Sequence, residues 1–192
     1  LGMVQHAYLH HNRPLSTGGN VPLRIHSEGV AGCNSEWIVL DRCTLLRSCW
    51  FQPDDGNGAA RDLNYLWIDR CYFANASGQY VVLDVFANSN LVIRNSIFYS
   101  IYNNGPCVSY RGSDANITTG ADWLIENNTF VHLWNQSWGD NLGWRLQAQA
   151  SSTQTGITFR NNLLVAMNVP SGNVSFLAAG NGSPVPATIL SA

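Results

Sequence analysis

Residues 91–101 read LVIRNSIFYSI, and four other segments of the chain repeat the same pattern. Each copy reads apolar, any residue, apolar, charged, Arg or Asn, small polar, any residue, and Leu or Phe. Such repeats at intervals of about 20–50 residues are typical of stacked architectures, so this phrase decides the fold. The other copies are WIVLDRCTLLRS from Trp37, YLWIDRCYFANA from Tyr65, DWLIENNTFVHL from Asp122 and GITFRNNLLVAM from Gly156.

The five copies align on a central apolar residue, here called the anchor. The anchors are spaced 28, 25, 32 and 34 residues apart, which indicates a repeat with loops of varied length inserted. Residues alternate with period two within each copy, and this alternation predicts strands. The anchors are Leu40, Ile68, Ile93, Ile125 and Phe159.

Two positions before the anchor and five positions after it, every copy carries an apolar residue, which we expect to be buried. The alternation changes phase between these positions, so the chain must bend. Asn at the bend favours this interpretation, because Asn tolerates left-handed backbone better than most residues. The later apolar position holds Leu45, Phe73, Phe98, Phe130 and Leu164, and the bend position holds Arg42, Arg70, Asn95, Asn127 and Asn161.

The residue after the bend is small and polar in every copy, and the alternation points it inward. In parallel copies stacked at about 4.8 Å, such side chains can form a ladder in which each bonds to the next. Strand-like runs stand between the phrases, so phrase plus run predicts one turn of a three-sided coil. The ladder position holds Cys43, Cys71, Ser96, Asn128 and Asn162, and the runs are VPLRIHS, QYVVLDVF, PCVSYRG, LGWRLQAQA and NVSFLAAG.

The composition supports a turn-rich β protein. Apolar residues make up 45% of the 192 residues and charged residues only 11%, with 17 Gly and 21 Asn. A net charge of −2 argues against a nucleic-acid partner, and the lack of a run of 18 apolar residues argues against a membrane span. We expect residues 1–192 to form a single domain that is part of a longer protein.

The Ile-x-Asn-Asn-x-Phe phrase with an inner Asn ladder resembles the right-handed parallel β-helix of the pectate-lyase-like superfamily, over residues 21–177. The resemblance implies an all-β solenoid of about five to six coils with inserted loops. A β-sandwich is the alternative, which the spacing does not favour. Members of the superfamily include polysaccharide lyases, polygalacturonases, phage tailspikes and surface adhesins. Most are extracellular, so the resemblance implies an extracellular or cell-surface location.

The position one past the anchor is predicted to point outward, and its last four members alternate in charge. Such an alternation predicts a charge ladder between neighbouring strands. The first two members, Asp41 and Asp69, carry like charges that would repel on neighbouring strands, so they need a separate explanation. The column is Asp41, Asp69, Arg94, Glu126 and Arg160.

Two interpretations of the Asp41 and Asp69 pair are open. In the favoured one, the neighbouring Arg42 and Arg70 neutralise the carboxylates, and the protein uses no cofactor. In the other, the two carboxylates hold Ca²⁺, a cation that prefers oxygen ligands. The resemblance to lyases then implies that Arg42 or Arg70 acts as the catalytic base.

The position one before the anchor is predicted to form an outward stripe that is mostly apolar. A long loop, a partner subunit or a sugar stacked on Trp67 could cover it, because aromatic rings offer flat apolar area. The stripe is Val39, Trp67, Val92, Leu124 and Thr158.

Other reactive residues carry weaker signals. His6, His10 and His11 are expected to be solvated, because no helix or acidic partner accompanies them. Cys43 and Cys71 share the ladder position, and we expect two buried thiols there rather than a disulfide. If a disulfide exists, Cys33 with Cys49 is the expected pair, and Cys107 completes the five cysteines.

Three functions fit this sequence. The favoured one is a non-catalytic extracellular β-helix module that acts in structure, adhesion or assembly and contacts carbohydrate. The second is a Ca²⁺-dependent polysaccharide lyase or another carbohydrate-active enzyme, although the GHG and RIK motifs of the polygalacturonase branch are absent. The third is a phage-type trimeric spike, in which the apolar stripe would be a self-assembly contact.

Overall fold

The structure is a computed structural model, and it shows an all-β chain in which every described strand pair is parallel. No helix occurs among the residues that it describes. The described residues are 7–13, 24–26, 35–46, 49–52, 63–75, 83–85, 90–100, 108–111, 122–132, 141–147, 157–166 and 175–179.

The described strands form three parallel sheets. Sheet 1 contains β1 (Ala7–His10), β3 (Ser35–Asp41), β6 (Leu63–Asp69), β9 (Asn90–Arg94), β12 (Asp122–Glu126) and β15 (Ile157–Arg160). Sheet 2 contains β4 (Thr44–Leu46), β7 (Tyr72–Asn75), β10 (Ile97–Ser100), β13 (Thr129–His132) and β16 (Leu163–Ala166). Sheet 3 contains β2 (Arg24–His26), β5 (Cys49–Gln52), β8 (Leu83–Val85), β11 (Val108–Arg111), β14 (Asn141–Gln147) and β17 (Ser175–Ala179).

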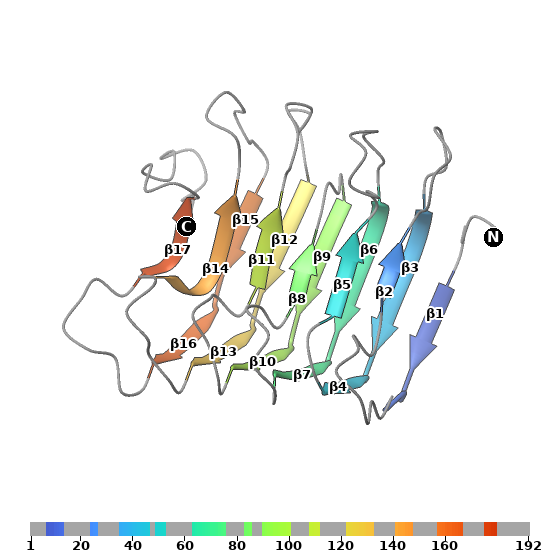
Figure 1. Cartoon of the computed structure of the whole chain (residues 1–192), viewed down its shortest axis with the longest axis horizontal. Coiled ribbons are helices and arrows are strands. Elements are labelled where there is room, and N and C mark those ends of the chain that lie inside the picture. Colours follow the sequence, from blue (N-terminus) through green and yellow to red (C-terminus); the bar gives the residue numbers. More distant parts are fainter. Residues whose placement is uncertain are drawn as a thin grey trace.

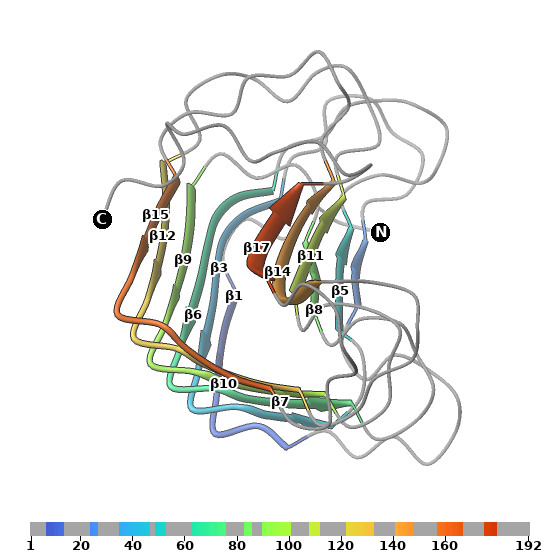
Figure 2. The ribbon, with the colours of Figure 1, turned by 90° about the vertical axis from the view of Figure 1, so that its left-hand side faces the viewer.

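From β3 onward the chain visits sheets 1, 2 and 3 in the same order five times, and we call each round a pass. Strands of successive passes therefore lie side by side along the long axis of the molecule (Figure 1). Figure 2 looks along this axis and shows the three sheets on three sides of a shared interior.

The five phrases stack in parallel and in register, as the sequence predicts. The anchors pair in chain order across sheet 1, from Leu40 with Ile68 to Ile125 with Phe159. A sixth copy precedes them, in which Leu9 of β1 pairs with Leu40. The sequence did not predict this copy, because Pro14 stands where the others have Leu or Phe. Strand β5 was not predicted either.

Aromatic stacking fills the interior behind sheet 2. Phe73, Phe98 and Phe130 are fully buried, with ring centroids 4.9 Å and 5.1 Å apart and ring planes within 10° of parallel. Leu45 is buried beside Phe73 at one end, as predicted. Leu164 pairs with Phe130 in the same column but is only half-buried, which corrects the expectation of full burial.

The bend has the left-handed backbone that the Asn residues suggest. Its φ angles lie between 52° and 54° in all six copies, including His11 in the first one. Hydrogen bonds between passes continue through the bend, for example from the Arg42 amide to the Asp69 carbonyl at 3.0 Å. Left-handed backbone costs a non-glycine residue about 1–2 kcal/mol, so these contacts between passes must offset a repeated strain.

The predicted inner ladder forms immediately after the bend. The backbone N–H of each of the first four ladder residues donates to the side chain of the ladder residue in the next pass. The donor–acceptor distances are 3.4 Å from Cys43 to Cys71 Sγ, 3.1 Å from Cys71 to Ser96 Oγ, 3.0 Å from Ser96 to Asn128 Oδ1 and 3.0 Å from Asn128 to Asn162 Oδ1. These bonds satisfy backbone groups that are buried away from water.

Cys43 and Cys71 are both buried free thiols, as expected. The Cys71 Sγ lies 3.5 Å from the Leu40 carbonyl and 3.3 Å from the Asp69 carbonyl, and its single proton can be donated to either oxygen. Burial raises the pKa of Cys71 to about 12. Cys33, Cys107 and the side chain of Cys49 lie outside the described residues, so the Cys33–Cys49 pairing stays a prediction.

We predict that Phe98→Ala lowers the free energy of unfolding by about 3–5 kcal/mol, the usual cost of removing a buried Phe. Ile97→Ala, on the exposed face of the same strand, is the matched control and should change it by about 0.5 kcal/mol or less. Chemical denaturation followed by circular dichroism measures both. Equal losses in the two variants would contradict the buried Phe stack.

We also predict that iodoacetamide does not modify Cys43 or Cys71 in the native chain at pH 8, because both thiols are buried and burial raises the pKa of Cys71. Both should become modified when the chain is unfolded in urea. Peptide mass mapping reads the labels. Rapid native labelling of either residue, or a Cys43–Cys71 disulfide, would contradict the ladder.

Candidate functional site

A pocket of about 500 Å³ opens on the outer face of sheet 1. None of the described residues that line it is charged, and its floor crosses strands β3, β6, β9, β12 and β15. Five strands at about 4.8 Å spacing make that floor about 19 Å long. The lining residues are Trp37, Val39, Tyr65, Leu66, Trp67, Asn90, Val92, Trp123, Leu124 and Thr158.

The predicted outward stripe forms the floor of this pocket. Its members pair in order from Val39 with Trp67 to Leu124 with Thr158. Trp67 is 41% exposed and the other four are half-buried. The prediction that this stripe faces outward is therefore confirmed.

A second aromatic feature lies two residues earlier on the same face, and sequence analysis did not single it out. Trp37 and Tyr65 stack with their ring centroids 4.0 Å apart and their planes 6° from parallel. More than two fifths of the surface of each of these two residues is exposed to solvent. The only sequence signal was that aromatic residues occupy the same position, before the first apolar residue, in two successive phrases.

Trp37 and Tyr65 also have left-handed backbone, with φ angles of 56° and 58°. For bulky residues such angles are uncommon and store about 1–3 kcal/mol each, and they concentrate at ligand sites. Strands β3 and β6 extend beyond these residues, and Figure 2 shows both strands curving at this end. The curved ends of β3 and β6 thus place two stacked rings, each on a strained backbone, at the edge of the pocket.

The guanidinium of Arg94 lies over the Trp67 ring, 4.8 Å from its centroid. Arg94 Nη2 also donates to Asp69 Oδ2 at 3.1 Å, while its buried Nε has no hydrogen-bond partner among the described residues. This cation–π contact fixes the Trp67 ring and connects the apolar pocket to the neighbouring charged residues.

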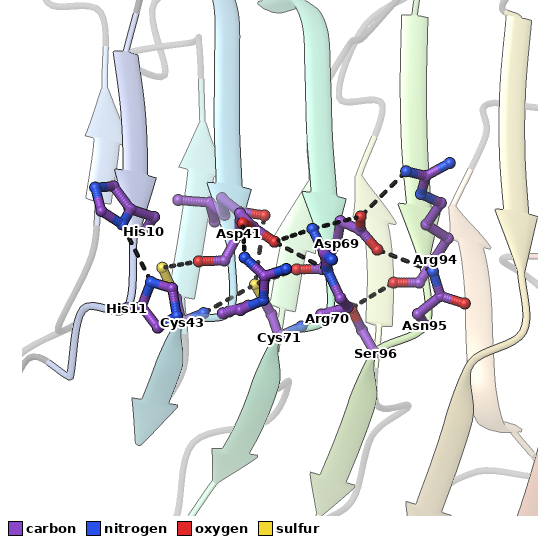
Figure 3. A network of polar contacts seen from close by, with 12 residues as sticks. His10, His11, Asp41, Cys43, Asp69, Arg70, Cys71, Arg94, Asn95 and Ser96 are labelled. Atoms are coloured by element: carbon purple, nitrogen blue, oxygen red, sulfur yellow. Dashed lines mark hydrogen bonds and ion pairs between the residues drawn. The ribbon is translucent and has the colours of Figure 1, made fainter.

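Those charged residues form an ion-pair network at the end of sheet 1 (Figure 3). Asp41 accepts from Arg42 Nη1 at 2.9 Å, from Arg70 Nη2 at 2.7 Å and from the Tyr8 hydroxyl at 3.2 Å. Asp69 contacts Arg94 at 3.1 Å and Arg70 at 3.4 Å. Arg70 thus bridges two carboxylates of like charge on neighbouring strands.

Both carboxylates are buried, with 4% of Asp41 and 6% of Asp69 exposed, although their column points outward. Each Asp turns toward an arginine, as the favoured interpretation expects, and the arginine side chains that cover the two carboxylates leave them buried rather than exposed. The expected charge ladder continues beyond them, with Arg160 and Glu126 in contact at 2.6 Å.

The environment of Asp69 favours its ionised form. Burial alone would raise the pKa of this carboxyl, but hydrogen bonds from Asn95 and Arg94 and the charges of Arg94 and Arg70 outweigh burial and lower it. Asn95 Nδ2 contributes a bond of 2.9 Å to Asp69 Oδ1.

The network limits what these residues can do chemically. A Ca²⁺ ion at Asp41 and Asp69 would have to displace guanidinium groups that already hold both carboxylates. Arg42 and Arg70, the candidate bases, each donate to Asp41. Within the described part of the chain, no group of three or more His, Cys, Asp or Glu side chains could hold a metal ion.

Comparison of the chain with protein-family models, with curated proteins and with solved structures finds no match in any of the three. The described residues contain no helix long and apolar enough to cross a membrane.

We predict that Asp69→Asn lowers the stability at pH 7 and that the deficit shrinks as the pH falls. Because the pKa of Asp69 is lowered by folding, its stabilising contribution is present above the unfolded pKa of about 3.9 and is lost as the pH falls through the lower folded value. Urea denaturation between pH 7 and pH 2.5 measures the difference from wild type. A deficit that does not change with pH would contradict this assignment.

Proposed function

We propose that the chain is an extracellular right-handed parallel β-helix module of the pectate-lyase-like type, and that it binds carbohydrate without cleaving it. The repeated visit to three parallel sheets in one order supports the solenoid. The inner ladder and the stacked Phe column support it further, because both require successive passes to lie directly on one another.

The aromatic lining of the sheet 1 pocket is the observation from which we infer a carbohydrate ligand. Trp37, Tyr65 and Trp67 are exposed, and two of them are stacked rings on strained backbone. The flat apolar faces of sugar rings pack well on such side chains, which have few rotamers to freeze on binding. A volume of about 500 Å³ lies within the usual range for small-ligand pockets.

The described lining residues carry no charge, and this favours a neutral sugar as the ligand. Asn90 and Thr158 are the polar members of the lining, and both can hydrogen-bond to hydroxyl groups. Arg94, whose guanidinium lies over the Trp67 ring of the lining, is paired with Asp69. The pocket crosses neighbouring strands, so we propose that a chain of several sugar residues lies across the strands.

The same network supports a binding role over a lyase role. A lyase needs a base that can take a proton, and a guanidinium that is paired with a carboxylate remains protonated. Arg70 contacts both Asp41 and Asp69, so the acidic pair and the candidate base neutralise one another.

The test is binding of the purified chain to a panel of neutral and uronic-acid oligosaccharides, measured by calorimetry. We expect at least one neutral oligosaccharide to bind, and Trp67→Ala or Tyr65→Ala to weaken it about tenfold, the effect of losing one aromatic contact of about 1.4 kcal/mol. Tyr99→Ala, which removes an aromatic from β10 of sheet 2, is the matched control and should leave the affinity unchanged.

Two outcomes would contradict the proposal. Equal affinity in Trp67→Ala and wild type would remove the pocket as the binding site. Ca²⁺-dependent release of unsaturated products from a uronic-acid polymer, lost in Asp41→Ala or Asp69→Ala, would establish the lyase instead. Folding of each variant is checked by circular dichroism.

A further inference from the structure

The left-handed bend brings two consecutive side chains into contact, which an extended strand would not do. In two passes these side chains are an Asp and an Arg, with contacts of 2.9 Å between Asp41 and Arg42 and 3.4 Å between Asp69 and Arg70. In the first copy of the phrase the same two positions hold His10 and His11. Their Nδ1 atoms lie 3.1 Å apart, and a dashed line joins the two rings in Figure 3.

The fold holds both imidazole rings in this arrangement. His11 occupies the bend with a φ angle of 53°. His10 ends β1 and stacks on Tyr8, with ring centroids 5.1 Å apart, and the Tyr8 hydroxyl is bonded to Asp41. The two imidazole planes are 87° apart, and both side chains are exposed to solvent.

Two facing imidazole nitrogens can share only one proton, because one nitrogen must accept while the other donates. A metal ion can replace that proton and bind both lone pairs. At metal–nitrogen distances of about 2.0–2.1 Å, tetrahedral geometry places two nitrogens about 3.3–3.4 Å apart and square-planar geometry about 2.9 Å apart. The observed separation of 3.1 Å lies between these values.

We propose that His10 and His11 form a two-nitrogen site for a divalent transition-metal ion. Imidazole pairs favour Cu²⁺ over Ni²⁺ and Zn²⁺, and they do not suit Ca²⁺, which takes oxygen ligands. Water completes the coordination, since Asp41 on the neighbouring strand is engaged by Arg42, Arg70 and Tyr8. The site is independent of the carbohydrate proposal, because no residue of β1 lines the pocket.

The test is a calorimetric titration of the untagged full chain with CuCl₂, NiCl₂, ZnCl₂ and CaCl₂. We expect one Cu²⁺ per chain, weaker Ni²⁺ and Zn²⁺ binding, and no Ca²⁺ binding. His10→Ala and His11→Ala should each weaken Cu²⁺ binding at least tenfold, because the chelate becomes a single ligand. His26→Ala, in β2 of sheet 3, is the matched control and should bind as wild type does.

Electron paramagnetic resonance of the Cu²⁺ complex provides a readout that is independent of affinity. We expect splitting from two imidazole nitrogens in the wild type and in His26→Ala, and from one fewer in His10→Ala or His11→Ala. Unchanged spectra and affinities in both His10→Ala and His11→Ala would overturn the proposal. Tenfold weaker binding in His26→Ala would also overturn it, because it would place the metal elsewhere.

Discussion

The left-handed bend with its inner ladder is the constraint on which the rest of the structure depends. Each bend turns the chain from sheet 1 into sheet 2, and the residue after it bonds to the next pass in the buried interior. An unpaired buried amide costs about 1–3 kcal/mol, so a slip of one residue in any pass would break the ladder and reverse the faces of the strand. The ladder thus fixes the register of every sheet.

This register converts a repeat in the sequence into columns of side chains on the surface. One column places Trp67 between Val39 and Val92, and another places Asp69 between Asp41 and Arg94. The fold depends chiefly on the inward positions and the bend, and the ion pairs of the second column add to its stability. The outward columns can therefore vary in chemistry from pass to pass, and the candidate sites lie on them.

The repeat made the stacking, the buried Phe column and the ladder predictable, since each follows from period-two alternation and a bend. What it could not reveal depends on distances between side chains. The burial of Asp41 and Asp69 arises from arginine side chains that fold over them, and no alternation pattern encodes that. The stack of Trp37 on Tyr65 requires the left-handed corner, which neither residue type favours. The contact between His10 and His11 became visible only when their segment proved to be a sixth copy.

The ladder residue and the bend residue change together along the molecule. Where the ladder residue is Asn, its amide can bond to both neighbouring passes, as Asn128 donates to the Ile93 carbonyl of the preceding pass and to Asn162 of the next. Where the ladder residue is Cys, sulfur is a weak acceptor, and the bond from Cys43 to Cys71 is long at 3.4 Å. In those same passes the bend residue is Arg, and its guanidinium pairs with Asp41. The Arg70–Asp41 pair thus joins two passes on the outside where the inner bond between their ladder residues is long. The Arg160–Glu126 pair joins two later passes in the same way, beside ladder residues that are both Asn.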